Sequence, residues 1–146
     1  MSFSDLPTGW AERPVTDPDI FDDAVDLIAT DDSRRSGSLY ILICDGSGRM
    51  FQPLVFDGSI YDESSPVQEA YLDSLCGILT QVGCRDVVLV IARRGHPAPS
   101  GNDHQFRAVA EKAFARHEIA ILGMSIATPA GVRGWLPESP GARRSA

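Results

Sequence analysis

The sequence predicts an α/β fold in which helices flank one mixed β-sheet in a single, three-layer-like domain. Three runs rich in Val, Ile and Leu are typical of buried strands, at residues 39–44, 86–92 and 119–126. A segment with apolar residues at helical spacing precedes each of these runs, and this order favours one sheet with helices packed on it. With 146 residues, of which 43% are hydrophobic, the chain is long enough to build one core.

The composition indicates a globular domain that is not held together by disulfides. The three cysteines are odd in number and lie in or beside apolar runs, so we expect buried free thiols in a reducing compartment. The net charge of −7 opposes unspecific binding to nucleic acid. No apolar stretch reaches the roughly 18 residues of a membrane span, and the N-terminus lacks a basic-then-apolar signal. These features predict a cytoplasmic protein without a membrane or nucleic-acid partner.

The first half of the chain predicts one helix followed by a β-hairpin. Asp17 and Pro18 have the residue types of an N-cap and a first helical position. The sequence Asp45-Gly-Ser-Gly48 is typical of a tight turn between two strands, and Pro53 indicates a bulge or an edge in the second strand. The expected segments are an irregular N-terminal stretch over residues 1–16, a helix over 17–29, a polar loop over 30–38, and strands over 39–44 and 50–56.

The second half predicts two longer helices that alternate with strands. Ser65-Pro66-Val67-Gln68 has the pattern of a capping box, and Gly83 supplies a stop. The apolar residues of that helix mark one face: Val67, Tyr71, Leu75, Ile78, Leu79 and Val82. The expected segments are helices over 65–82 and 100–117, strands over 86–92, 119–126 and 132–136, and a disordered tail over 137–146, which gives one folded domain over 17–136.

The segment Val90-Ile-Ala-Arg-Arg-Gly-His-Pro-Ala-Pro-Ser-Gly-Asn-Asp103 resembles a site of the RadC-like branch of the JAB/MPN metalloprotease family. In that family a strand ends in His-x-His-Pro-Ser-Gly, and a following Pro-Ser-x-x-Asp starts a helix. Gly95, Pro99, Ser100 and Asp103 fall on the family's Gly, Pro, Ser and Asp. The resemblance covers roughly residues 20–136 and implies the JAB/MPN architecture, which is similar to that of cytidine deaminases.

The departures from the family pattern imply that the metalloprotease reaction is absent. The two zinc-binding histidines of the family fall on Val90 and Ala92, its glutamate falls near Gly37, and its serine becomes Arg94. A catalytic zinc needs three protein ligands, and Asp103 alone remains. We therefore expect no catalytic residue, no metal and no cofactor. The resemblance implies a pseudoenzyme that acts as a protein-interaction or scaffolding module, with a protein partner or a second copy in a homodimer.

The same loop carries three further interpretations. Ser100 and Asp103 match a structural helix cap. His96, Asp103 and His104 form the candidate set for a relocated metal site, which is the alternative of a metal-dependent hydrolase. Arg93 and Arg94, at the end of a strand and before a helix N-terminus, form a candidate pocket for an anion, which is the alternative of an anion- or nucleotide-binding regulator. The candidate ligand-binding residues are Arg93, Arg94, His96 and Asp103.

Overall fold

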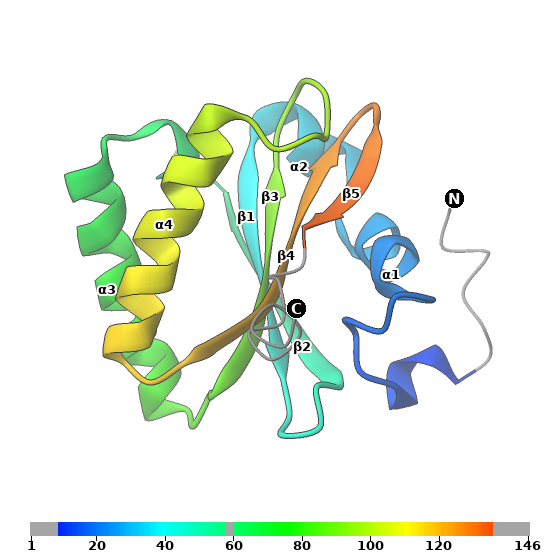
Figure 1. Cartoon of the computed structure of the whole chain (residues 1–146), viewed down its shortest axis with the longest axis horizontal. Helices are drawn as coiled ribbons and strands as arrows, with labels where there is room; N and C mark the ends of the chain where they lie inside the picture. The colour runs from blue at the N-terminus through cyan, green and yellow to red at the C-terminus, as the bar shows by residue number, and fades with distance from the viewer. Residues whose placement is uncertain (1–8, 58–59, 136–146) are drawn as a thin grey trace, which may run out of the picture.

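The computed structural model describes residues 9–57 and 60–135 and confirms the α/β class (Figure 1). Its sheet has five strands in the order β2-β1-β3-β4-β5. Their bounds are β1 Ser38–Cys44, β2 Met50–Asp57, β3 Asp86–Ala92, β4 Ala120–Thr128 and β5 Gly131–Trp135. The helices are α1 Phe21–Ile28, α2 Asp31–Ser36, α3 Ser65–Gln81 and α4 Gly101–Arg116, with short 3-10 helices at Trp10–Glu12 and Ile60–Asp62.

The sheet is mixed because only one neighbouring pair of strands is parallel. Strand β1 pairs antiparallel with both β2 and β3. Strands β3 and β4 are parallel, as expected when a helix, here α4, connects them. Strand β5 returns antiparallel to β4. The strands β2 and β5 therefore form the two edges of the sheet.

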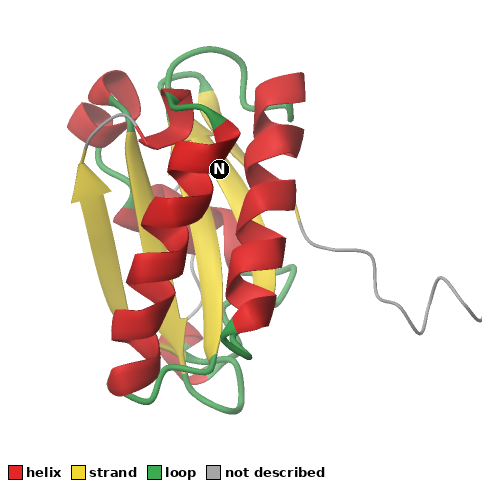
Figure 2. Ribbon diagram, turned by 90° about the vertical axis from the view of Figure 1, so that its left-hand side faces the viewer, coloured by secondary structure: helices red, strands yellow, loops and turns green. Residues whose placement is uncertain are grey.

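Helices cover both faces of the sheet, as the three-layer prediction requires. Figure 2 shows the long helices α3 and α4 side by side over one face, while Figure 1 shows α1 on the other side of the sheet. The first face packs against Leu72 of α3 and Phe106 and Phe114 of α4, all of which are buried. The second face packs against Phe21 and Val25 of α1. Burial on both faces explains why β1 and β3 are continuous apolar runs.

The start of α4 follows the predicted pattern. Ser100 is its N-cap and accepts a hydrogen bond from the backbone N–H of Asp103, whose side chain in turn accepts from the N–H of Ser100. This reciprocal arrangement is a capping box. The buried residues of the helix include Phe106 and Phe114.

The other helices depart from the sequence prediction. Helix α1 begins at Phe21 because Asp17 and Pro18 lie in a preceding turn, in which the Asp17 carboxylate accepts from the N–H of Asp19. Residues 31–36 of the expected polar loop form α2, which Thr30 caps by accepting from the N–H of Ser33.

Helix α3 differs from its prediction in its cap and in its buried face. Its N-cap is Ser64, which makes no side-chain cap bond, so the predicted capping box is wrong. The amide of Gln68 instead donates to the carbonyls of Ile60 and Tyr61. Four of the residues assigned to its apolar face are exposed, namely Val67, Tyr71, Ile78 and Val82. The buried face consists of Gln68, Leu72, Leu75, Cys76 and Leu79.

The structure describes only part of the two terminal segments of the chain. The expected disordered tail over 137–146 lies outside the described residues, as do residues 1–8. Within the expected irregular N-terminal stretch, Val15 is buried against the sheet face that α1 covers. None of the helices in the described ranges is long and apolar enough to cross a membrane.

Helix α1 packs against β5 at Gly134, so we expect Gly134→Ala to destabilise the protein. A Cβ atom there would lie 2.9 Å from Cδ2 of Phe21 and 2.7 Å from Oδ1 of Asp22. Because the Phe21 ring is buried and cannot yield freely, the expected loss is roughly 1–3 kcal/mol in the free energy of unfolding by urea.

The matched control is Gly77→Ala in α3, where a Cβ would meet no atom within 4 Å. Alanine is the better helix former, so this variant is expected to gain roughly 0.5–1 kcal/mol. Equal effects of the two substitutions would contradict the close packing of α1 on β5.

Candidate functional site

An ion pair between Arg93 and Asp103 lies where β3 ends and α4 begins. Nη2 of Arg93 donates to Oδ2 of Asp103 at 2.6 Å, and Nε donates to Oδ1 at 3.1 Å, so the contact is bidentate. Asp103 is fully buried, while the Arg93 side chain is 14% exposed. A buried carboxylate is stable only when its charge and its lone pairs are satisfied, and the arginine supplies the charge.

Two further groups complete the surroundings of Asp103. The hydroxyl of Tyr61 donates to Oδ1 at 2.6 Å, and Ser100 donates to Oδ2 from its backbone N–H at 2.8 Å and from its hydroxyl at 3.1 Å. Tyr61 belongs to the 3-10 helix Ile60–Asp62, which precedes α3. The cluster of Arg93, Asp103, Tyr61 and Ser100, which we call the Asp103 cluster, therefore joins three separate segments of the chain.

The pKa values of the cluster follow from these contacts. Burial opposes ionisation of Asp103, but the hydrogen bonds from Arg93, Tyr61 and Ser100 outweigh it and lower the pKa of this carboxyl. The bond to Asp103 raises the pKa of Arg93. Burial and the bond to Asp103 raise the pKa of Tyr61 to about 12, so its hydroxyl remains a proton donor. At neutral pH the cluster is thus an ionised pair beside a neutral phenol.

Arg93 also shapes the loop that connects β3 to α4. Its Nη1 donates to the carbonyls of Arg94 at 2.8 Å and His96 at 3.0 Å, and Nη2 donates to the carbonyl of Ala98 at 3.2 Å. Together with the two bonds to Asp103, these contacts occupy the whole donor capacity of the guanidinium group. Arg93 is therefore a structural residue here and offers no free donor to a ligand.

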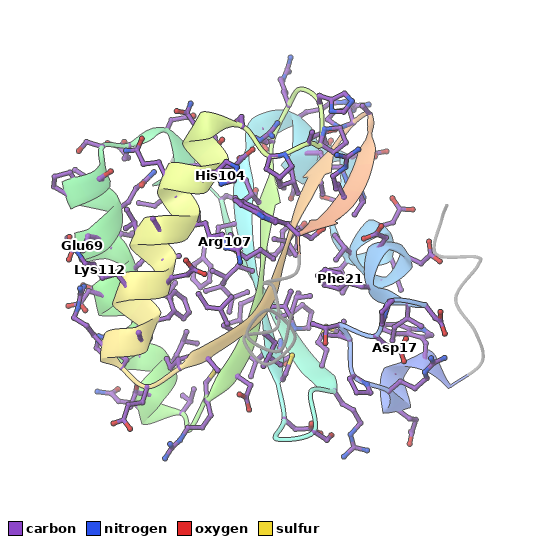
Figure 3. All side chains as sticks on the ribbon, viewed as in Figure 1. Asp17, Phe21, Glu69, His104, Arg107 and Lys112 are labelled. Atoms are coloured by element: carbon purple, nitrogen blue, oxygen red, sulfur yellow. The ribbon has the colours of Figure 1, made fainter. Side chains whose placement is uncertain are left out.

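The structure does not gather the three candidate metal ligands around one point. Asp103 points at Arg93, and Nδ1 of His96 accepts from the backbone N–H of Ala98 at 3.1 Å. The His104 ring packs edge-on against the Trp135 ring, with the two ring centroids 4.8 Å apart. Figure 3 shows His104 and Arg107 on α4, and Arg107 lies over the same Trp135 ring at 4.5 Å. Among the described residues, no group of three His, Cys, Asp or Glu side chains is placed to hold a metal ion.

The positions that correspond to the family's histidines lie inside the sheet. Val90 and Ala92 are buried on the face that α1 covers, whereas Asp103 belongs to a helix on the opposite face. The end of β3 contributes Ala92 and Arg93 to the lining of one cavity. Gly37, where the family's glutamate falls, lines the same cavity.

This cavity, which we call the arginine cavity, has a volume of about 280 Å3. The end of α2 contributes Arg35, the 3-10 helix before α3 contributes Tyr61 and Asp62, and the end of β3 contributes Arg94. Nε of Arg94 donates to the carbonyl of Arg35 at 2.8 Å. Of the three arginines that line this cavity, Arg93 uses its guanidinium group to bind Asp103. Arg35 and Arg94 are the two arginines whose charges are left to face the cavity.

Sequence reasoning missed Arg35 and Tyr61. Arg35 lies in a stretch expected to be a loop and is 59 residues from Arg94, the residue that its carbonyl contacts. Tyr61 is 42 residues from Asp103 and belongs to no motif. No local spacing marks either residue, because both reach the site through the pairing order of the strands.

The three cysteines are buried and free, as the sequence predicts. Burial raises the pKa of Cys44 and of Cys76 to about 12, and it raises the pKa of Cys84 as well. The thiolate form is therefore suppressed in all three, and they behave as core residues.

Comparison with known proteins leaves the family open. No model of a known protein family matches the chain. No curated protein matches it either. The resemblance of residues 90–103 to the JAB/MPN pattern therefore stays a prediction.

Asp103→Asn is expected to cost roughly 3 kcal/mol in the free energy of unfolding, because it leaves the Arg93 charge without its buried partner. Urea unfolding followed by circular dichroism measures this loss. The control is Glu69→Gln, which removes an ion pair with Arg116 in which both side chains are more than 40% exposed. Exposed pairs contribute little, so the control should lose much less. Equal losses would show that the Asp103 cluster is not a structural centre.

The same cluster predicts a specific sensitivity to acid. The pKa of Asp103 is lowered from the ordinary 3.8, so its contribution to stability is complete above that pH and is lost as the pH falls through the folded-state pKa. Urea unfolding at stepwise lower pH should therefore give a shallower fall in stability for Asp103→Asn than for the wild type. Parallel pH profiles of the two proteins would contradict the lowered pKa.

Proposed function

We propose that this chain is a non-catalytic binding domain, a JAB/RadC-like pseudoenzyme that acts as an interaction module by pairing with a second copy of itself. The observation that carries this proposal is an apolar strip on the outer side of α3, formed by Val67, Tyr71, Ile78 and Val82. Ile78 is 60% exposed and Val82 is 70% exposed. Exposed apolar side chains aligned on one side of a surface helix are typical of interaction surfaces.

The strip faces away from α4 and runs beside the edge strand β2. Glu69 and Asp73, which form ion pairs with Arg116 of α4, lie on roughly the opposite side of the α3 helix. Towards the start of α3, Val67 and Tyr71 share a cavity of about 310 Å3 with Asp57 of β2. Towards its end, Val82 shares a largely apolar cavity of about 450 Å3 with Gln52 of β2. The strip and the strand edge therefore form one elongated surface.

An unpaired edge strand adds hydrogen-bonding groups to this surface. Among the described strands β2 pairs with β1 alone, so no described strand occupies the backbone groups on its outer side, and these can pair with another chain. The protein carries a net charge of −7, which repels two copies from each other, whereas the strip contains no charged residue. Contact through the strip is thus the least costly approach, and a two-fold pairing buries each strip against the other.

The non-catalytic part of the proposal rests on Asp103. This is the single residue that matches a metal ligand of the family pattern, and its two oxygens already accept bonds from Arg93, Tyr61 and Ser100. An arginine beside a carboxylate takes the place that a cation would need. The Asp103 cluster therefore supports a structural role at the position where the resemblance puts catalysis.

Ile78→Glu is expected to weaken self-association at least about tenfold, because it places a charge in the middle of the strip. Sedimentation velocity over the micromolar to millimolar range measures the monomer–dimer equilibrium. The control is Ala108→Glu, which adds the same charge at an exposed position of α4 and should leave the equilibrium unchanged. A wild-type chain that stays monomeric over the whole range, or an Ile78→Glu variant that dimerises as well as the control, would overturn the proposal.

A further inference from the structure

We propose that the arginine cavity is a binding site for an oxyanion, a phosphate or carboxylate group held between Arg35 and Arg94. The proposal goes beyond self-association and is independent of it, because it uses neither Ile78 nor Val82. It concerns the end of the sheet where β1 starts and β3 ends.

The two arginines at the cavity have unused donors. Nε of Arg94 is bound to the carbonyl of Arg35, which leaves both terminal amino groups of Arg94 without an acceptor in the described part of the chain. The guanidinium group of Arg35 forms no hydrogen bond or ion pair with any described residue, although Asp31 lies one helical turn before it. Guanidinium groups with free, coplanar donors bind carboxylates and phosphates in a bidentate manner.

The pattern of ion pairs distinguishes Arg35 and Arg94 from the arginines that precede them in the sequence. Most of the described arginines form an ion pair within 4.0 Å, including Arg34 and Arg93, which directly precede Arg35 and Arg94 in the sequence. Among residues 9–57 and 60–135, the exceptions are Arg35, Arg85, Arg94 and Arg133. Two of these exceptions line the same cavity.

The surroundings hold Arg94 ready for a ligand. The bond from its Nε to the end of α2 fixes the plane of the guanidinium group before any ligand arrives, which lowers the entropic cost of binding. Asp62 is the acidic group in the lining, so the two arginines exceed it in charge. Arg93 adds no attraction because Asp103 neutralises it. The cavity therefore carries a net positive charge in a chain of net charge −7.

The test is a titration of 15N-labelled protein with inorganic phosphate, followed through the side-chain Nε–H signals of the arginines. We expect the signals of Arg35 and Arg94 to move along a saturable curve, and the affinity to fall about tenfold in Arg35→Gln, which removes one bidentate partner. Arg35→Gln leaves the carbonyl that binds Arg94 in place, so it preserves the fold better than a change of Arg94.

The control is Arg85→Gln, which removes another unpaired arginine at the opposite end of β3, next to the cavity shared with Val82. It should bind phosphate as the wild type does. A parallel titration with acetate distinguishes the two kinds of anion: tighter binding of acetate assigns the site to carboxylates, and tighter binding of phosphate assigns it to phosphate groups. Linear, non-saturating shifts shared by Arg85, or an unchanged affinity in Arg35→Gln, would overturn the proposal.

Discussion

The buried ion pair between Arg93 and Asp103 is the contact on which the arrangement of the other elements depends. A fully buried carboxylate is costly unless its charge is balanced and its oxygens are bonded, and here every partner comes from a different part of the chain. Arg93 directly follows the last residue of β3, Ser100 caps α4, and Tyr61 lies in the short 3-10 helix before α3. The pair thus fixes the end of the sheet relative to the layer formed by α3 and α4.

The parts of the fold that the sequence predicts well are those that depend on local chemistry. The strands β1 and β3 are recognisable because both faces are covered, which requires continuous apolar runs. The cap of α4 is recognisable because Ser100 and Asp103 are three residues apart. Helix α2 was missed because it is short and polar, and it is held by Arg34, whose buried guanidinium donates to the carbonyls of Ala29 and Thr128. Such tertiary contacts leave no periodic signal.

The same distinction between local sequence signals and tertiary contacts applies to the site and to α3. The spacing from Ser100 identifies Asp103, but the sequence gives no sign that Arg93 binds this carboxylate and is not available to a ligand. Arg35 and Tyr61 lie far from the motif in sequence, so no spacing could point to them. In α3, counting apolar residues favoured Val67 and Ile78 over Gln68, yet Gln68 is buried because its amide holds the preceding 3-10 helix. A polar residue with a specific partner can displace apolar residues from a core face.

The Arg93 side chain shapes the loop after β3 through bonds to the backbone carbonyls of that loop. Arg93 donates to the carbonyls of residues 94, 96 and 98, and a carbonyl is the same group whatever side chain its residue carries. Substitution of the side chains of residues 94 and 98 therefore leaves these bonds in place, whereas Arg93 and position 95, with its φ of 99° that favours glycine, are required for the shape of the loop. What this end of the molecule presents to the solvent is therefore separable from the guanidinium group that holds the loop backbone beneath it.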